Sequence, residues 1–328
     1  MSLRRIMLAP PRNAMMAAML PCERRMLSRI GDASVHESPV FIVGPPRSGT
    51  TLLYETLVTR FRFSYFSNAA HRIHRTPAVA TSLFKSSIRN WRGAFKSEYG
   101  KIKGWGAPCE AGWIWDRWMS GLRHSNSDRV DHESVLEMQR TIKAIANLID
   151  APFLGKNVDL SECLTALDHV FPGCVFLHIQ RSEADCIRSI YRLRKKRLGA
   201  DRMQEWLSVK PKGWKAYRGA EPIRQIAAQV FGVHQDIRND ASLIGAHRVH
   251  GIDYEALCEN PNREMNAIEA FLNTSRVTIE RRDELPRQFE RPAFRPLEAR
   301  LERMISESIE HWKSAPSSVD GSPVKRAA

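Results

Sequence analysis

The stretch from Pro39 to Glu55, PVFIVGPPRSGTTLLYE, decides the fold that we predict for this chain. Its apolar, β-branched beginning, Val40–Val43, is typical of a buried parallel strand. A glycine-bounded turn, Gly44–Gly49, follows, and Thr50–Arg60 then has the pattern of a helix. Backbone amides at such a helix start face the turn, and the helix macrodipole favours an anion there. The stretch therefore predicts an α/β fold with a phosphate-binding loop.

The two glycines have the spacing of a nucleotide-binding P-loop, but Thr50 stands where such loops carry a lysine. Positive charge at the phosphates must then come from elsewhere, and Arg47, inside the loop, is the nearest source. Thr51 occupies the position that holds magnesium in nucleotide triphosphatases. The best acidic partner for such a metal, Asp253, ends a strand pattern too mixed to support that role, so we expect no metal.

The sequence PPRSGTT after an apolar strand resembles the phosphosulfate loop of PAPS-dependent sulfotransferases, P-loop enzymes of bacterial and carbohydrate-sulfotransferase type. PAPS is 3′-phosphoadenosine 5′-phosphosulfate, and the product left from it is 3′,5′-adenosine bisphosphate. The resemblance implies that the loop holds the 5′-phosphosulfate through Arg47, Ser48, Gly49, Thr50 and Thr51. The family also needs a second phosphate site further along the chain.

A second apolar strand pattern begins at Val175 and ends at Arg181, where a helix follows directly. Ser182 and Asp185 form a capping-box pattern at its start. Ser189 lies about two helical turns after Arg181, so both side chains can point to the same side of the strand end. Arg181 and Ser189 resemble the family's 3′-phosphate site, although the family often has Arg-Asp-Pro where this chain has Arg-Ser-Glu.

A third strand and helix occupy Val249–Leu272, with Asn260 and Pro261 suited to the N-cap and first helical position. The resemblance implies that Tyr254 contacts the adenosine half of PAPS, and the alternative is that it only ends a core strand. Many cytosolic members carry an aromatic residue just after the phosphate loop. Leu52 and Leu53 are found there in this chain, which leaves open what stacks on the adenine.

Sulfuryl transfer needs groups that stabilise the charge on the transferring group and on the departing phosphate oxygen. Arg47 is placed to stabilise the leaving oxygen. Lys156, at the end of the short strand pattern Phe153–Lys156, resembles the lysine that touches the transferring group in several sulfotransferases. The alternative for Lys156 is an exposed lysine at a strand end.

The base that deprotonates the acceptor is the hardest residue to assign, because no histidine follows Lys156. Other members use a glutamate, and Glu110 lies in a glycine-rich stretch between Trp105 and Trp113. Burial beside these rings would make it a stronger base. Asp159 is the second candidate, whereas His178, inside its strand, is expected to be a core histidine.

The length of 328 residues, with 43% hydrophobic residues, suits one domain that buries a full core. We predict a P-loop three-layer sandwich with a central, mainly parallel sheet and helical insertions, spanning residues 38–313. Residues 1–37 are an expected N-terminal extension, and 314–328 an expected disordered tail. The aromatic and cationic residues between Leu198 and Asp240 suggest a substrate lid, and the alternative is a surface loop whose aromatic residues pack into the core.

Cysteine usage and the start of the chain indicate the compartment. The six cysteines are scattered without metal-ligand spacing and are typical of reduced intracellular thiols. Pro10 and Pro11 break the first apolar stretch, which makes it a poor signal peptide, and no stretch is long and apolar enough to cross a bilayer. These patterns favour a cytoplasmic protein.

The formal net charge of +14 raises the alternative of a nucleic-acid-binding protein, but the cations are spread along the chain. A P-loop kinase would share the loop but require a lysine and magnesium, and a coenzyme A acyltransferase is a more distant alternative. We therefore expect a PAPS-dependent sulfotransferase that modifies a hydroxyl or amine of a small-molecule, glycan or lipid acceptor. The sequence predicts neither the acceptor nor the oligomeric state.

Overall fold

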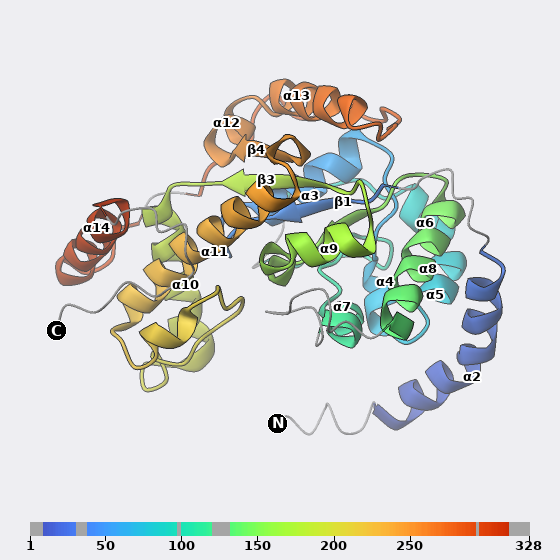
Figure 1. Ribbon diagram of the computed structural model, residues 1–328, viewed down its shortest axis with the longest axis horizontal. Coiled ribbons are helices and arrows are strands. Elements are labelled where there is room, and N and C mark those ends of the chain that lie inside the picture. Colours follow the sequence, from blue (N-terminus) through green and yellow to red (C-terminus); the bar gives the residue numbers. More distant parts are fainter. Residues whose placement is uncertain (1–8, 31–37, 97–99, 120–131, 293–294, 315–328) are drawn as a thin grey trace.

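Four parallel strands form the centre of the protein. The computed structural model describes residues 9–30, 38–96, 100–119, 132–292 and 295–314 (Figure 1). The strands lie in the spatial order β2 (Leu154–Lys156), β1 (Val40–Val43), β3 (Val175–Gln180) and β4 (Val249–Asp253), and every neighbouring pair is parallel. All four carboxyl ends therefore lie at one edge of the sheet. The predicted α/β class with a parallel sheet is confirmed.

Helices cover both faces of this sheet, because successive residues of a strand point to opposite sides. Phe41 and Val43 enter one core and Val40 and Ile42 enter the other. Helices that contribute to the first core include α7 (Gly112–Met119), α8 (His132–Ile149), α9 (Leu164–Val170) and α11 (Pro222–Ile244). Helices that contribute to the second core include α3 (Thr50–Arg60), α12 (Tyr254–Glu259) and α13 (Pro261–Thr274). Figure 1 shows the resulting three layers, with α12 and α13 above the sheet and α9 and α11 below it.

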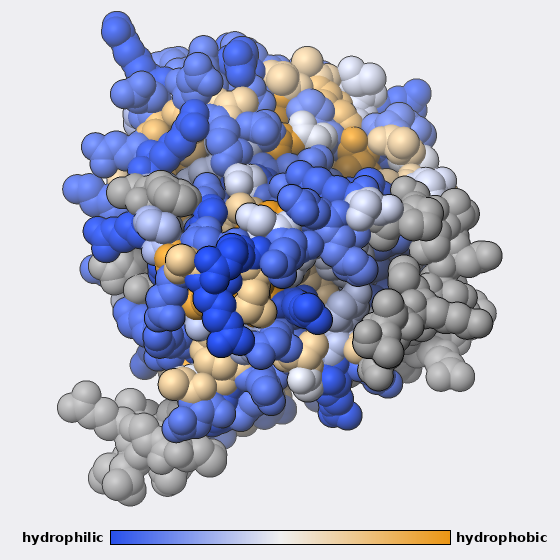
Figure 2. Space-filling model, turned by 90° about the vertical axis from the view of Figure 1, so that its left-hand side faces the viewer, coloured by the Kyte–Doolittle hydropathy of each residue, from blue (hydrophilic) through white to orange (hydrophobic). Residues whose placement is uncertain are grey.

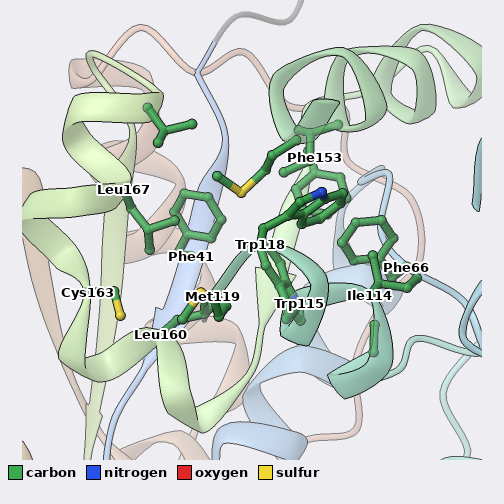
Figure 3. Packing of buried hydrophobic residues seen from close by; sticks show 14 of the residues in the cluster. Phe41, Phe66, Ile114, Trp115, Trp118, Met119, Phe153, Leu160, Cys163 and Leu167 are labelled. Carbon is green, nitrogen blue, oxygen red and sulfur yellow. The ribbon is translucent and has the colours of Figure 1, made fainter. Parts of the chain in front are cut away.

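An aromatic cluster around Phe41 fastens α7 to the sheet (Figure 3). The Phe41 ring lies 5.8 Å from the ring of Phe176 and 6.3 Å, edge to face, from that of Trp115 on α7. Phe66 adds an edge-to-face contact with Trp115 at 5.4 Å. Such contacts favour one ring geometry over others. The start of α7, two residues after Glu110, is thereby held in a fixed position relative to β1.

The predicted caps are confirmed. Ser182 Oγ accepts a hydrogen bond from the amide of Asp185 at the start of α10 (Glu183–Leu198), and Asn260 caps α13. The segment 158–170 forms two elements rather than one continuous helix. Asn157 caps a 3-10 helix, η2 (Val158–Glu162), and α9 begins only after Cys163, whose φ of −134° breaks the helical path.

The remaining helices lie beside the layers. α4 (Asn68–Arg72), α5 (Pro77–Leu83) and α6 (Lys85–Arg89) precede α7 in the helical insertion. The described part of residues 1–37 contains α2 (Ala9–Ser28), which packs on α5 and α8. α14 (Ala299–Ser314) packs on α10 and α11, and the expected tail lies outside the described residues apart from Ser314. Two short 3-10 helices, η3 (Trp214–Tyr217) and η4 (Ala246–Arg248), flank α11.

His178 is a buried core residue, as predicted. Its Nε2 lies 2.9 Å from Nδ1 of His234 on α11, and burial lowers the pKa of His178 to about 3 and that of His234 to about 4. All six cysteines are free thiols. Across the described ranges, no helix is both long and apolar enough to cross a membrane, and no three His, Cys, Asp or Glu side chains gather as a metal would require.

Candidate active site

The loop Gly44–Gly49, which the sequence predicts to bind phosphate, is held in its shape by close packing against β3 and α12. Gly49 has a φ of 102° and caps α3, and a Cβ built on it would lie 2.2 Å from Cδ2 of Tyr254. Arg47 also has a positive φ, 70°. Only glycine tolerates both this backbone and this proximity at position 49. The loop is therefore a compact turn that delivers the first amides of α3, which have no intrahelical acceptor, to the sheet edge.

A buried serine that the sequence did not reveal holds the beginning of the loop. Ser161, in η2, is fully buried; its Oγ accepts from the amide of Gly44 at 3.0 Å and lies 3.2 Å from the Gly44 carbonyl oxygen, to which it donates. Ser48, predicted to bind phosphosulfate, is also fully buried, and its hydroxyl donates to the carbonyl of Pro45. Both hydroxyls thus stabilise the loop backbone, and Ser161 ties it to the segment that follows β2.

The structure brings the second motif onto the first. Arg47 donates from Nε to Ser189 Oγ at 2.9 Å, although 142 residues separate them in the chain. Arg181 donates from Nη1 to the carbonyl oxygen of Arg47 at 3.3 Å. Arg47, Arg181 and Ser189 therefore form one cationic cluster at the carboxyl ends of β1 and β3, as expected for the two strand ends. The direct contact of the Arg47 side chain with Ser189 was not predicted.

The ring of Tyr254 packs against this cluster. The guanidinium of Arg181 lies 4.5 Å from the centre of the Tyr254 ring, and Tyr254 is 5% exposed. Burial raises the pKa of Tyr254, so its hydroxyl stays protonated at neutral pH. The residue begins α12 rather than ending β4, because the side chain of Asp253 accepts from the amide of Ala256 and starts the helix.

A cavity of about 660 Å³ opens beside Arg181 and Tyr254. Its other walls come from Ser182, Asp185, Asp253, Glu255, Arg291 and Pro292. Arg291 was not predicted from the sequence, because the irregular segment that contains it gives no sign that the chain returns to this edge of the sheet after α13. Figure 2 looks onto the side toward which β3 points, and its surface is largely hydrophilic with apolar residues between. The cavity suits a polar ligand with an apolar or aromatic part.

A third group, Lys156, Glu110 and Thr51, lies at the end of β2. Lys156 is 2% exposed, forms an ion pair with Glu110, and donates from Nζ to Thr51 Oγ1 at 3.2 Å. Asn157 donates to the Glu110 carbonyl at 3.3 Å and fixes the loop that carries it. Lys156 is thus not an exposed strand-end lysine. It faces the first turn of α3, beside the phosphate loop.

The burial expected for Glu110 between two tryptophans is not found. The Glu110 side chain is 43% exposed, Trp105 stacks on Phe84, and Trp113 stacks on His71. The ion pair with Lys156 is the dominant contact of this carboxylate, which faces solvent on its other side. Asp159, the second candidate base, lies in η2 with its amide bonded to Asn157 Oδ1.

Residues 39–278 match the sequence model described as the sulfotransferase family. The chain is similar to the crystal structure of sulfotransferase STF9 from Mycobacterium avium, with 16% identity and a TM-score of 0.52 over 94% of this chain and 77% of that one. Sulfotransferase STF1 from Mycobacterium tuberculosis H37Rv shows 13% identity and a TM-score of 0.49 over 80% of this chain and 72% of that one. None of the curated proteins compared with the chain matches it.

We expect Gly49→Ala to destabilise the protein, since a positive φ costs a non-glycine residue about 1–3 kcal/mol and the new methyl group would displace Tyr254. Urea unfolding measures the loss. Gly112→Ala is the matched control, because nothing lies within 4 Å of its added Cβ and it begins a helix; it should be neutral or slightly stabilising. Equal stability of the two variants would contradict the described loop packing.

Proposed function

Because the chain belongs to the sulfotransferase family, and its members transfer sulfuryl groups, we propose that it uses PAPS as the donor and a hydroxyl or amine as the acceptor. The observation that carries this proposal is the convergence of Arg47, Arg181 and Ser189 at the ends of β1 and β3. A cluster of two arginines and a serine beside a P-loop suits a phosphate separate from the 5′ chain, such as the 3′-phosphate that PAPS has and ATP lacks.

The residues present fit a 3′-phosphate. Nε of Arg181 is buried and has no hydrogen-bond partner among the described residues, which leaves a donor for a ligand oxygen. Arg181 is held by the Tyr254 ring and by Asp185, whose carboxylate lies 3.8 Å away. Its guanidinium is thus oriented before the ligand arrives, and an oriented arginine binds phosphate with two parallel hydrogen bonds.

The phosphate loop and Lys156 suit the 5′-phosphosulfate. The first amides of α3 and the side chain of Thr51 face the same edge as Nζ of Lys156. Bound PAPS supplies a sulfuryl group linked to a phosphate, a good leaving group. Lys156 would stabilise negative charge on the transferring group, and Arg47 charge on the departing oxygen, because cations fixed in a water-poor site act strongly there.

Two phenylalanines offer a wall for the adenine in place of the missing aromatic residue after the loop. The rings of Phe95 and Phe289 are 4.8 Å apart and half-buried. The amide of Phe95 donates to Glu55, one turn after Leu52 on the same face of α3, and Phe289 precedes cavity residue Arg291 by two positions. An aromatic face at this position would stack on a base with about 1–3 kcal/mol.

The ion pair of Lys156 and Glu110 suggests how the base becomes active. With no anion bound, the ammonium holds the carboxylate. An anionic donor beside Lys156 competes for the same ammonium, which leaves Glu110 free to accept the proton of the acceptor hydroxyl or amine. Acceptor deprotonation would thus be coupled to donor binding, and the half-exposed carboxylate faces the side from which an acceptor can arrive.

Replacing Arg181 should remove the preference for a 3′-phosphate. We expect Arg181→Ala to bind 3′,5′-adenosine bisphosphate about 10- to 100-fold more weakly, the usual cost of lost hydrogen bonds to a charged group, with a smaller effect on ADP. Isothermal titration calorimetry gives both affinities. Arg192→Ala is the control, because Arg192 is an exposed arginine on the same helix that donates to the carbonyl oxygens of Arg295 and Pro296. Equal losses for bisphosphate and ADP would mean that Arg181 does not recognise the 3′-phosphate.

Glu110→Gln should lower turnover by about 100- to 10,000-fold, the range for loss of a general base, while the affinity for 3′,5′-adenosine bisphosphate stays near that of the original protein. The amide keeps a hydrogen bond to Lys156 but accepts no proton. Formation of the bisphosphate from PAPS with an acceptor found by screening measures turnover. A variant that loses bisphosphate affinity instead would place Glu110 in the donor site.

A further inference from the structure

A second and larger cavity lies on the helical side of the molecule. It measures about 1120 Å³ and is lined by residues of α2, α7 and α8 and by the link between α4 and α5. These elements occupy the right half of Figure 1, away from α10 and α14. None of the donor-site residues named above lines this cavity. The cavity therefore either binds a ligand other than the donor or has only a structural role.

Trp113 connects this cavity to the active site. It lies three residues after Glu110, at the start of α7, and is 39% exposed. The His71 ring stacks on Trp113 at 4.5 Å, and the guanidinium of Arg12, from α2, lies 5.1 Å from the centre of the same ring. Burial and the charge of Arg12 lower the pKa of His71, and the charges of Asp116 and Glu110 oppose them. The Trp113 ring thus lies between the imidazole of His71 and the guanidinium of Arg12 at the cavity.

The cavity holds arginines that its own carboxylates do not neutralise. Arg24, Arg75 and Arg140 line it, and none of them forms an ion pair within the described residues. Two of the carboxylates are already engaged. Glu23 is buried and accepts from the amides at the start of α5, and Glu137 pairs with Arg117.

Two further carboxylates, Asp116 and Glu133, also line the cavity, and Asp116 has a partner in the structure. Arg12 adds to the cationic side, because its Nε is buried without a hydrogen-bond partner. Arginine is the side chain best suited to carboxylate, sulfate and phosphate groups. Among the cavity side chains without an ion-pair partner in the described part of the chain, positive charges therefore outnumber negative ones. The exposed ring of Trp113 lies beside them.

We propose that this cavity is an acceptor subsite that binds an anionic group, carboxylate, sulfate or phosphate, on a molecule whose hydroxyl or amine reaches Glu110 past Trp113. This inference rests on the proposed function. It makes α2 part of the acceptor site, through Arg12 and Arg24, and it narrows the acceptor from any hydroxyl or amine to a molecule that carries negative charge.

The test is calorimetric binding to the full chain with 3′,5′-adenosine bisphosphate present. The probes are a glucuronic-acid-containing trisaccharide, glycerol phosphate and a neutral trisaccharide, so that sugar acids and lipid-type phosphates are distinguished. We expect at least one anionic probe to bind, the neutral sugar not to bind, and Arg75→Ala/Arg140→Ala to weaken the anionic probe by about 10-fold or more. Arg224→Ala/Arg300→Ala, which removes equal charge from exposed sites on α11 and α14, should leave binding unchanged.

Three results would overturn the proposal: neither anionic probe binds, the neutral sugar binds equally well, or the two double variants weaken binding equally. The last would indicate attraction by net charge alone. Titration of 3′,5′-adenosine bisphosphate into the same variants keeps the two proposals separate. Unchanged bisphosphate affinity shows that the variants are folded, whereas bisphosphate binding that fails in the original chain would contradict the donor assignment and not the cavity.

Discussion

In-register parallel pairing is the constraint on which the site depends. β1 pairs with β2 on one side and with β3 on the other, so that Ile42 is opposite Lys156 and Val43 opposite His178. The end of β1, which leads into the loop Gly44–Gly49, therefore lies one strand spacing, about 4.8 Å, from β2 on one side and from β3 on the other. Lys156 and Arg181 lie on either side of the loop. A slip of one residue would turn each strand's side chains to the other face. The aromatic packing of Phe41 and the alternate residues of β1 in two cores oppose such a slip.

The neighbouring strand ends place several cationic side chains close together, and few carboxylates lie beside them. Arg181 has the face of Tyr254 and the carboxylate of Asp185, and Lys156 has Glu110. The remaining capacity of these cations, including the buried Nε of Arg181, is available to a ligand. A site of this kind favours a polyanion by electrostatics and selects among polyanions by where the donors point.

Local patterns predicted the elements well, and contacts between distant residues could not be predicted. The apolar run before Gly44, the capping box at Ser182 and the Asn260-Pro261 start depend on neighbours in sequence, and all three are confirmed. The hydrogen bond between Ser161 and Gly44 joins residues 117 positions apart in the sequence. The bond of Arg47 to Ser189 joins residues 142 positions apart. No periodicity encodes such pairs. The exposure of Glu110 was misjudged because nearby tryptophans in sequence stack on other partners in space.

The most direct test of the donor assignment is a thermal-shift comparison of 3′,5′-adenosine bisphosphate, ADP and ATP, each with and without magnesium, at one fixed moderate salt concentration. A ligand that binds only the folded chain raises the melting temperature by mass action. We expect the bisphosphate to stabilise the protein without magnesium and well beyond ADP. Stabilisation by ATP only with magnesium, with no advantage for the bisphosphate, would contradict the assignment of Arg47, Arg181 and Ser189 to a 3′-phosphate.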